Sequence, residues 1–169
     1  MKICYGVEMK ALKEKLPGYT AQIIKKTAEL ANVIDRDDQL VIIESKTEAA
    51  QLAAFYQEKD ILENQFTLFR LEQVEMTDLF FDYGFSSTSN HAYLYEETSL
   101  PFIIKNGDLK QIEMALLQIE EHLIAKETND QIFYYINRHQ KELIEKYAQA
   151  YNITISFPYD DENASRQTL

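Results

Sequence analysis

Apolar side chains recur at helical spacing in the first third of the chain. Pro17-Gly18 is expected to end the first of these segments, and the polar run 35–38 is expected to end the second. The spacing predicts helices over residues 7–16, 20–34 and 49–63.

A longer apolar seam follows the turn signal Asn106-Gly107-Asp108. From Leu109 to Leu123 the apolar residues are three or four positions apart, which predicts a helix over 109–126. A second seam predicts a helix over 130–151. Because the link between them is short, we expect an antiparallel helix hairpin.

Short runs rich in β-branched and aromatic residues separate these helices. Such runs, bounded by polar clusters, are typical of buried strands. The segment 76–85 fits either a strand or a short helix, and its periodicity leaves both open. The pattern predicts strands over residues 2–5, 39–44, 66–71, 91–95, 100–105 and 152–157.

These elements predict an α+β or α/β fold. We expect a mixed sheet of about five strands with about five helices, the C-terminal hairpin packed on the sheet and followed by a last strand. A chain of 169 residues with 46% apolar residues can bury one core, so we expect a single domain over residues 1–159. The tail, residues 160–169, has no apolar periodicity and is expected to be frayed or disordered.

The composition indicates where in the cell the protein is expected. The chain has no run of about 18 apolar residues, and its first residues carry lysines where a secretory signal needs an apolar stretch. We therefore expect a cytoplasmic protein with no membrane contact. Cys4 is the single cysteine, which excludes an internal disulfide and a cysteine-built zinc site.

The net charge of −11 is concentrated in the middle of the chain. Residues 1–34 carry six lysines against three glutamates, whereas residues 35–100 carry fourteen acids against four bases, a charge of −10. Direct nucleic-acid binding is disfavoured, because it requires lysine and arginine to neutralise phosphates. The charge serves either ordinary solubility or an acidic face that meets a basic partner.

Motifs for several chemistries are missing from the sequence. It contains no HExxH, GxSxG, GxxxxGKS/T or GxGxxG, and its four glycines are too scattered for a phosphate-binding loop. We therefore predict no metal and no cofactor. His91 lies beside a polar turn, where it is either a general base or a residue of the turn.

The segment 78–102 crowds aromatic, hydroxyl and acidic side chains around that turn. Large aromatics are most often core residues, but Tyr is also enriched at protein interfaces. We take as candidate interface or pocket residues Phe80, Phe81, Tyr83, Phe85, Ser87, Thr88, His91, Tyr93, Tyr95, Glu96 and Glu97.

Part of this segment resembles a motif of mono-ADP-ribosyltransferases. Phe85 followed by Ser87-Thr88-Ser89 matches the aromatic-x-Ser-Thr-Ser triplet that shapes the nicotinamide pocket in that family. The resemblance implies that the arginine that grips NAD would fall on Arg70. The family's Glu-x-Glu, which carries the catalytic glutamate, is absent from the sequence, so this interpretation is disfavoured.

Two functional hypotheses follow. The leading one is a small acidic protein-interaction module, of the inhibitor, adaptor or immunity type, that meets a basic or nucleic-acid-binding protein partner. The alternative is a small-molecule-binding domain or enzyme with an aromatic and hydroxyl pocket around residues 83–95. The first hypothesis makes the protein a non-enzyme, and neither determines its oligomeric state.

Overall fold

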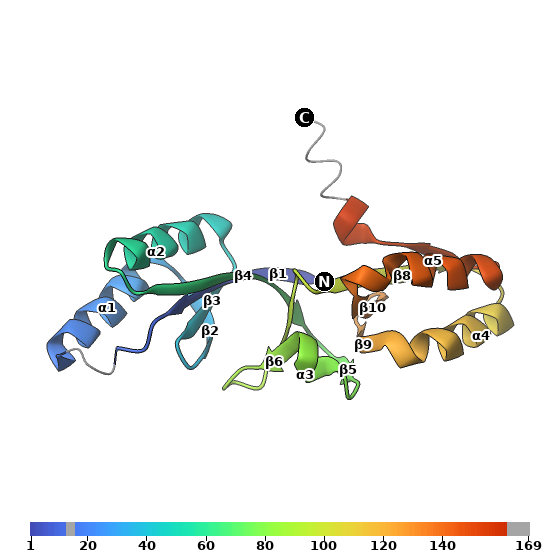
Figure 1. The fold of residues 1–169 in the computed structure, drawn as a ribbon, viewed down its shortest axis with the longest axis horizontal. Helices are drawn as coiled ribbons and strands as arrows, with labels where there is room; N and C mark the ends of the chain where they lie inside the picture. Colours follow the sequence, from blue (N-terminus) through green and yellow to red (C-terminus); the bar gives the residue numbers. More distant parts are fainter. Residues whose placement is uncertain (13–15, 162–169) are drawn as a thin grey trace. The chain divides into compact units, whose positions relative to one another are not determined.

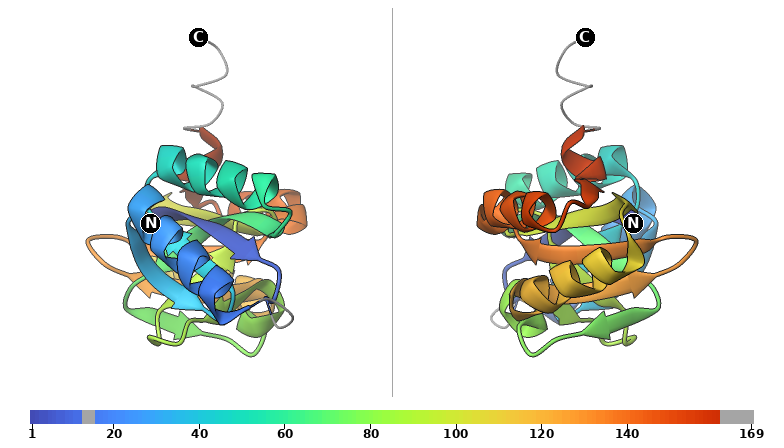
Figure 2. Two further views of the ribbon diagram at one scale, coloured as in Figure 1. Left: turned by 90° about the vertical axis from the view of Figure 1, so that its left-hand side faces the viewer. Right: turned by 90° about the vertical axis from the view of Figure 1, so that its right-hand side faces the viewer.

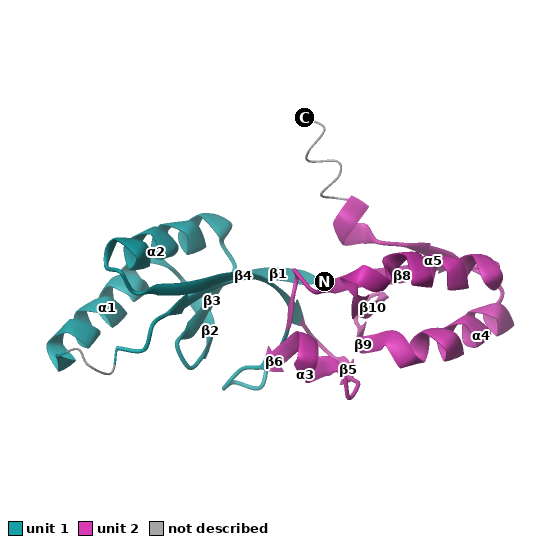
Figure 3. Cartoon of the chain, viewed as in Figure 1, with its two compact units in different colours: residues 1–70, 86–93 teal, residues 71–85, 94–169 magenta. Residues whose placement is uncertain are grey.

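The computed structural model describes residues 1–12 and 16–161. The chain groups into two compact units, the first made of residues 1–70 and 86–93 and the second of residues 71–85 and 94–169 (Figure 3). The region expected to be globular therefore contains two units, each with its own sheet and helices.

The first unit has a β-α-β-β-α-β chain order (Figure 1). Its sheet has the strand order β2-β3-β1-β4 with antiparallel neighbours, which is the ferredoxin-like arrangement. The elements are β1 (Lys2–Met9), α1 (Pro17–Leu30), β2 (Val33–Asp37), β3 (Leu40–Ile43), α2 (Lys46–Glu58) and β4 (Leu62–Leu71).

Helices α1 and α2 cover the same face of this sheet (Figure 2). Val7 of β1 and Val41 of β3 are directly opposite in the register, and both pack with Ile23 of α1 and Leu52 of α2. Ser45 precedes α2 and accepts a hydrogen bond from the backbone N–H of Glu48, which caps the helix.

The second unit repeats the same chain order from β8 to β11. Its strands follow the order β11-β8-β10-β9-β5, and α4 and α5 pack on one face of them. The elements are β8 (Ser99–Asn106), α4 (Leu109–Ile119), β9 (Leu123–Thr128), β10 (Ile132–Asn137), α5 (Lys141–Ala150) and β11 (Thr154–Ser156). The sequence shows no internal repeat, so the two ferredoxin-like units share topology rather than a visible residue pattern.

Shorter elements join the two repeats and end some helices. Strands β6 and β7 extend the first sheet beyond β4, and β5 forms an edge of the second sheet. These elements are β5 (Val74–Met76), α3 (Phe80–Tyr83), β6 (Gly84–Ser86), β7 (Ala92–Tyr95) and the 3-10 turns Glu120–His122 and Arg138–Gln140.

The predicted helix hairpin is wrong at the end of its first helix and at the start of its second helix. Helix α4 ends at Ile119, and α5 begins only at Lys141, so the chain between them forms the β9–β10 hairpin. The run Ile132–Ile136 is β-branched and aromatic, which favours a strand, and its alternate residues serve both faces of a sheet. A helical seam and a buried strand are hard to separate in such a run.

The N-terminal elements also differ from the prediction. The helix expected over 7–16 is absent from its described part, because β1 continues to Met9 and pairs with both β3 and β4. Pro17 begins α1 rather than ending a helix, as its fixed φ angle allows at a first helical position. The predicted helix over 20–34 stops at Leu30, and the missed strand β2 follows it.

The predicted α+β class is confirmed, whereas the predicted mixed sheet is wrong. Two antiparallel sheets of six and five strands take its place. The segment 76–85, which fitted a strand or a helix, contains the end of β5, the short helix α3 and the start of β6.

Residues 162–169 of the predicted tail lie outside the described residues. Asp160, at the start of that tail, is held by Arg138 at 3.0 Å and by Lys141 at 2.7 Å. In the described parts of the chain, no helix combines the length and the apolar character needed to cross a membrane.

Two glycines provide a matched test of this packing. A Cβ on Gly107 would lie 2.8 Å from Ile153 Cγ2 and 3.1 Å from Ile112 Cγ1, and Ile153 is buried. We expect Gly107→Ala to lower the free energy of unfolding by about 1–3 kcal/mol in urea denaturation, because the added methyl overpacks this contact.

Gly18→Ala is the control. Gly18 lies in the first turn of α1, and among the described residues no atom lies within 4 Å of a Cβ built there. Since Ala favours a helix over Gly, we expect stabilisation of up to about 1 kcal/mol. Equal effects of the two substitutions would contradict the packing described at Gly107.

Candidate functional site

A buried carboxylate on β2 organises a polar cluster in the first unit. Asp35 is 6% exposed and lies opposite Ile42 of β3. The next residue, Arg36, pairs with Val41 on the helix-covered face, so Asp35 points to the opposite face of the sheet. The backbone N–H of Arg36 donates a hydrogen bond to Asp35 Oδ1 at 2.8 Å. A charge in this position needs further donors to be stable.

Three side chains of the segment 87–93 supply further hydrogen-bond donors to Asp35. The distances to Asp35 Oδ2 are 2.6 Å from Ser87 Oγ, 2.8 Å from the Tyr93 hydroxyl and 2.8 Å from His91 Nδ1. An ionised carboxylate only accepts hydrogen bonds, so His91 carries its hydrogen on Nδ1. The Asp35 carboxylate therefore fastens the segment 87–93 to β2.

The segment itself is a tight turn. The Ser87 N–H donates to the His91 carbonyl at 2.9 Å, and the Asn90 N–H donates to the Ser87 carbonyl at 2.8 Å. Asn90 has a φ of 61°, a left-handed conformation that Asn adopts more readily than most residues. Thr88 and Ser89 are exposed at the tip.

The hydrogen bonds determine the charge state of the cluster. Burial alone would raise the pKa of Asp35, but the hydrogen bonds from Ser87, the Arg36 N–H, His91 and Tyr93 outweigh it and hold this pKa well below its usual range. Burial, together with the hydrogen bond to Asp35 and its charge, raises the pKa of the Tyr93 hydroxyl. Asp35 is thus ionised and Tyr93 neutral at physiological pH.

In this geometry the serine and the histidine both bind Asp35, and the His91 backbone N–H donates to Ser87 Oγ at 3.2 Å. Ser87 is 3% exposed and donates its hydroxyl hydrogen to Asp35, so it lacks the serine-to-histidine hydrogen bond of an activated nucleophile. His91 is the accessible member, with 42% of its side chain exposed. The arrangement is suited to anchoring a turn, with His91 as its one solvent-facing acid–base group.

A second buried carboxylate occupies a similar place in the second unit. Glu127 on β9 is 1% exposed and accepts hydrogen bonds from the Tyr135 hydroxyl at 2.9 Å, the Glu72 N–H at 2.9 Å and the Asn129 side chain at 3.0 Å. Burial, and then the charge of Glu127, raises the pKa of Tyr135. Each repeat therefore holds one carboxylate on its second strand, bound by a tyrosine.

The sequence-predicted site residues are divided between the two units. Ser87, Thr88, His91 and Tyr93 belong to the first unit, and three of them meet at Asp35. The others belong to the second unit and are Phe80, Phe81, Tyr83, Phe85, Tyr95, Glu96 and Glu97.

Among the aromatics of the second unit, Phe81 is the most exposed. Its side chain is 67% exposed, whereas Phe80 beside it is fully buried. Phe85 and Tyr95 pack with ring centroids 5.7 Å apart, and the Tyr83 hydroxyl accepts a hydrogen bond from Asn137 at 2.9 Å. Most of these rings therefore serve packing, as large aromatics usually do.

Glu96 is part of an ion-pair network rather than a free acid. Arg138 reaches its carboxylate at 2.9 Å and its backbone oxygen at 3.1 Å, and also pairs with Asp160. Burial alone would raise the pKa of Asp160, but Lys141 and Arg138 lower it. Glu97, in contrast, is exposed.

The residues of the ADP-ribosyltransferase resemblance lie in both units. Ser87 is held by Asp35, and Phe85 packs on Tyr95. Arg70 lies on β4 opposite Lys2 of β1, and its Nε is buried without a hydrogen-bond partner.

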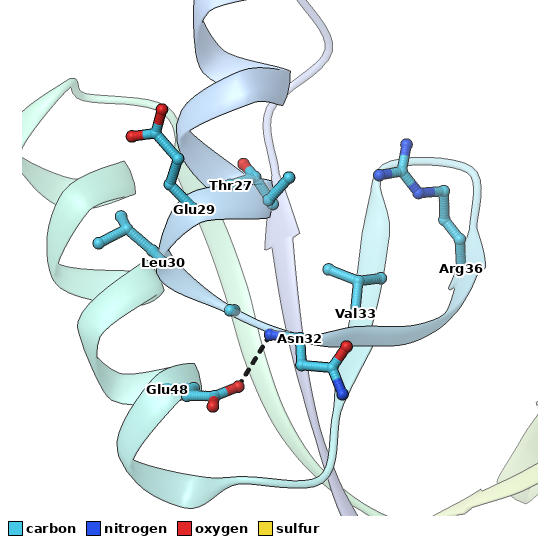
Figure 4. A pocket seen from close by; sticks show the side chains of 9 residues that line it. Thr27, Glu29, Leu30, Asn32, Val33, Arg36 and Glu48 are labelled. Atoms are coloured by element: carbon cyan, nitrogen blue, oxygen red, sulfur yellow. Dashed lines mark hydrogen bonds between the residues drawn. The ribbon is translucent and has the colours of Figure 1, made fainter.

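A polar pocket of about 400 Å³ opens at the C-terminal end of α1 (Figure 4). Glu48 of α2 closes one side of it by accepting a hydrogen bond from the Asn32 N–H at 2.8 Å. Arg36 of β2 and Glu29 of α1 line it as well. Its wall is a mixture of backbone, acid and base, with Thr27 already hydrogen-bonded to Tyr56 at 2.8 Å.

A larger and more apolar groove lies in the second unit, between α4 and strands β9, β10 and β5. We call it the α4 groove, and it has a volume of about 530 Å³. Its apolar lining is Leu116, Leu117 and Ile119 of α4 with Leu123 and Tyr134, and its charged residues are Glu75, Glu113, Glu120 and Lys126.

The sequence pattern did not reveal this groove. Leu116 belongs to the predicted apolar seam, but Leu117 beside it points elsewhere on the helix and is 65% exposed. One apolar residue at this place is enough for the seam, so the second of the two adjacent leucines was the sequence signal for an exposed apolar surface. The floor depends on β9 and β5, which the sequence interpretation assigned to a helix and to an undecided segment.

In the described part of the chain, no group of three or more His, Cys, Asp or Glu side chains is arranged to hold a metal ion.

No protein-family model matches the sequence, and no curated protein matches it significantly.

Replacing Asp35 tests whether its carboxylate anchors the segment 87–93 to β2. Asp35→Asn removes the charge that three side chains donate to, and we expect the free energy of unfolding at pH 7 to fall by about 1–3 kcal/mol. The pKa of Asp35 is lower in the folded protein than the unfolded value of about 3.9, so its stabilisation is present above that pH and is lost as the pH falls. The difference between the variant and the wild type should therefore shrink in urea denaturation below pH ~4.

Asp60→Asn is the matched control. Asp60 is almost fully exposed, and its pairing with Lys10 at 3.1 Å is a surface contact. Asn also tolerates the φ of 54° at this position. An equal loss of stability in both variants, or a constant difference at all pH values, would refute the anchoring role of Asp35.

Proposed function

We propose that this protein is an acidic protein-interaction module that binds a basic segment of a partner protein through the α4 groove. The observation that carries the proposal is the combination of an apolar lining with acids at the rim of one groove. Interfaces typically place buried apolar anchors at the centre and polar groups around them.

Exposed apolar side chains on α4 support this assignment. Leu117 lines the groove at 65% exposure, and Met114, one turn before it, is 42% exposed. Leaving large apolar side chains in water is unfavourable, and covering them with a partner removes that cost.

Charge supports a basic partner. The chain carries a net charge of −11, so its field attracts cationic surfaces and repels nucleic-acid phosphates. At the groove, Lys126 is neutralised by Glu75 at 2.9 Å, which leaves Glu113 and Glu120 as its remaining charges.

The alternative hypothesis placed a small-molecule pocket around residues 83–95. The two cavities described above are lined by other residues, and Ser87 and Tyr93 are occupied with Asp35. Protein binding at the α4 groove is therefore the function that the geometry supports best.

The test compares Leu117→Glu with Leu109→Glu. Leu109 is 79% exposed at the start of the same helix but does not line the groove. The tagged wild-type protein and both variants are used to capture partners from native cytoplasm at low and high salt. The captured protein is then purified and titrated against each of them.

We expect Leu117→Glu to weaken binding at least about tenfold, as loss of a central apolar anchor does, and Leu109→Glu to bind as the wild type. Binding should also weaken as salt increases. A partner that binds Leu117→Glu as tightly as the wild type would show that the groove is not the site. An affinity independent of salt would rule out the basic partner.

A further inference from the structure

The floor of the α4 groove is the part of the second sheet that lies beside α4, buried at Phe102 and Tyr134 and exposed at Glu75. The register aligns Phe102, Tyr134, Lys126 and Glu75 in one row across β8, β10, β9 and β5. Phe102 and Tyr134 stack with ring centroids 5.2 Å apart and pack with Ile119 of α4. The row then continues over β9 and β5, where Lys126 and Glu75 line the groove.

The shape of this space matches a helix. Helix α4 forms one wall, and helices on a sheet pack side by side at about 10 Å. A helix satisfies its own backbone hydrogen bonds, so it can cover side chains such as Leu117 and Leu123 without needing backbone partners from the floor.

An extended partner strand would instead have to pair with the edge strand β5. That strand is only three residues long, Val74–Met76, and offers a short ladder. The geometry therefore favours a helix beside α4 over a strand added to the edge.

Two acids set the spacing of the partner's charges. Glu113 lies on α4, and Glu120 is the helical residue that directly follows its last residue. They are seven residues apart and both line the groove, so they lie on the same side of the helix about 10 Å apart along its axis. Both are exposed, and neither forms an ion pair among the described residues. Leu116 and Leu117 lie between them.

We propose that the α4 groove receives an α-helix of the partner that carries two basic residues seven positions apart, with apolar residues between them. The basic side chains face Glu113 and Glu120, and the apolar ones contact Leu116, Leu117 and Tyr134. This inference rests on the proposed function and specifies the form of the bound segment.

The probe is a fluorescein-labelled, alanine-rich peptide of about 18 residues, long enough to form a helix. It carries two lysines seven positions apart and leucines three and four positions after the first lysine. One comparison peptide has the same composition with the lysines adjacent, and another has a central proline that breaks the helix. Affinities for the full-length protein are measured by fluorescence anisotropy.

We expect the helical peptide to bind at least about tenfold more tightly than either comparison peptide. The double variant Glu113→Lys, Glu120→Lys should lose at least about tenfold in affinity for it. Glu145→Lys, an exposed position on α5 outside the groove, should bind it as the wild type does.

Two results would overturn the inference. Equal binding of the proline peptide would show that the bound form is not a helix, and equal binding by the double variant would show that Glu113 and Glu120 do not select it. In either case the natural partner's response to Leu117→Glu still tests the proposed function separately.

Discussion

The buried Asp35 carboxylate joins the segment 87–93 to the sheet of the first unit. A buried charge is stable only when donors surround it, and here the donors come from residues more than fifty positions later in the chain. Glu127 does the same in the second unit for the turn at Glu72. Each of the two carboxylates therefore binds one part of the connection between the repeats, the segment that contains β5, α3, β6 and β7.

Local patterns predicted the helices that combine a clear apolar spacing with a capping residue. Helix α2 and the first part of α4 follow from apolar spacing and a nearby cap, Ser45 in one case and Asp108 in the other. Strands β2, β9 and β10 did not follow from such patterns, because pairing with neighbouring strands stabilises them. Their apolar residues fit a helical seam as well as a strand, and periodicity alone does not separate the two.

The candidate site was predicted in part. His91, Ser87 and Tyr93 were singled out together, and the structure brings them to one carboxylate. Asp35 itself was assigned to a polar turn, because an acid between polar residues is usually solvated. The groove on α4 required knowing which strand the helix leaves uncovered, and no local pattern contains that information.

The same β-α-β-β-α-β topology occurs twice in this chain and leaves an opening beside the first helix of each repeat. In the first repeat that opening is polar and lined by Arg36, and in the second it is lined by leucines and Tyr134. Identical architecture thus supports two different lining chemistries in one polypeptide. The difference between the two openings therefore comes from the side chains that line them and not from the topology, which is the same in both repeats.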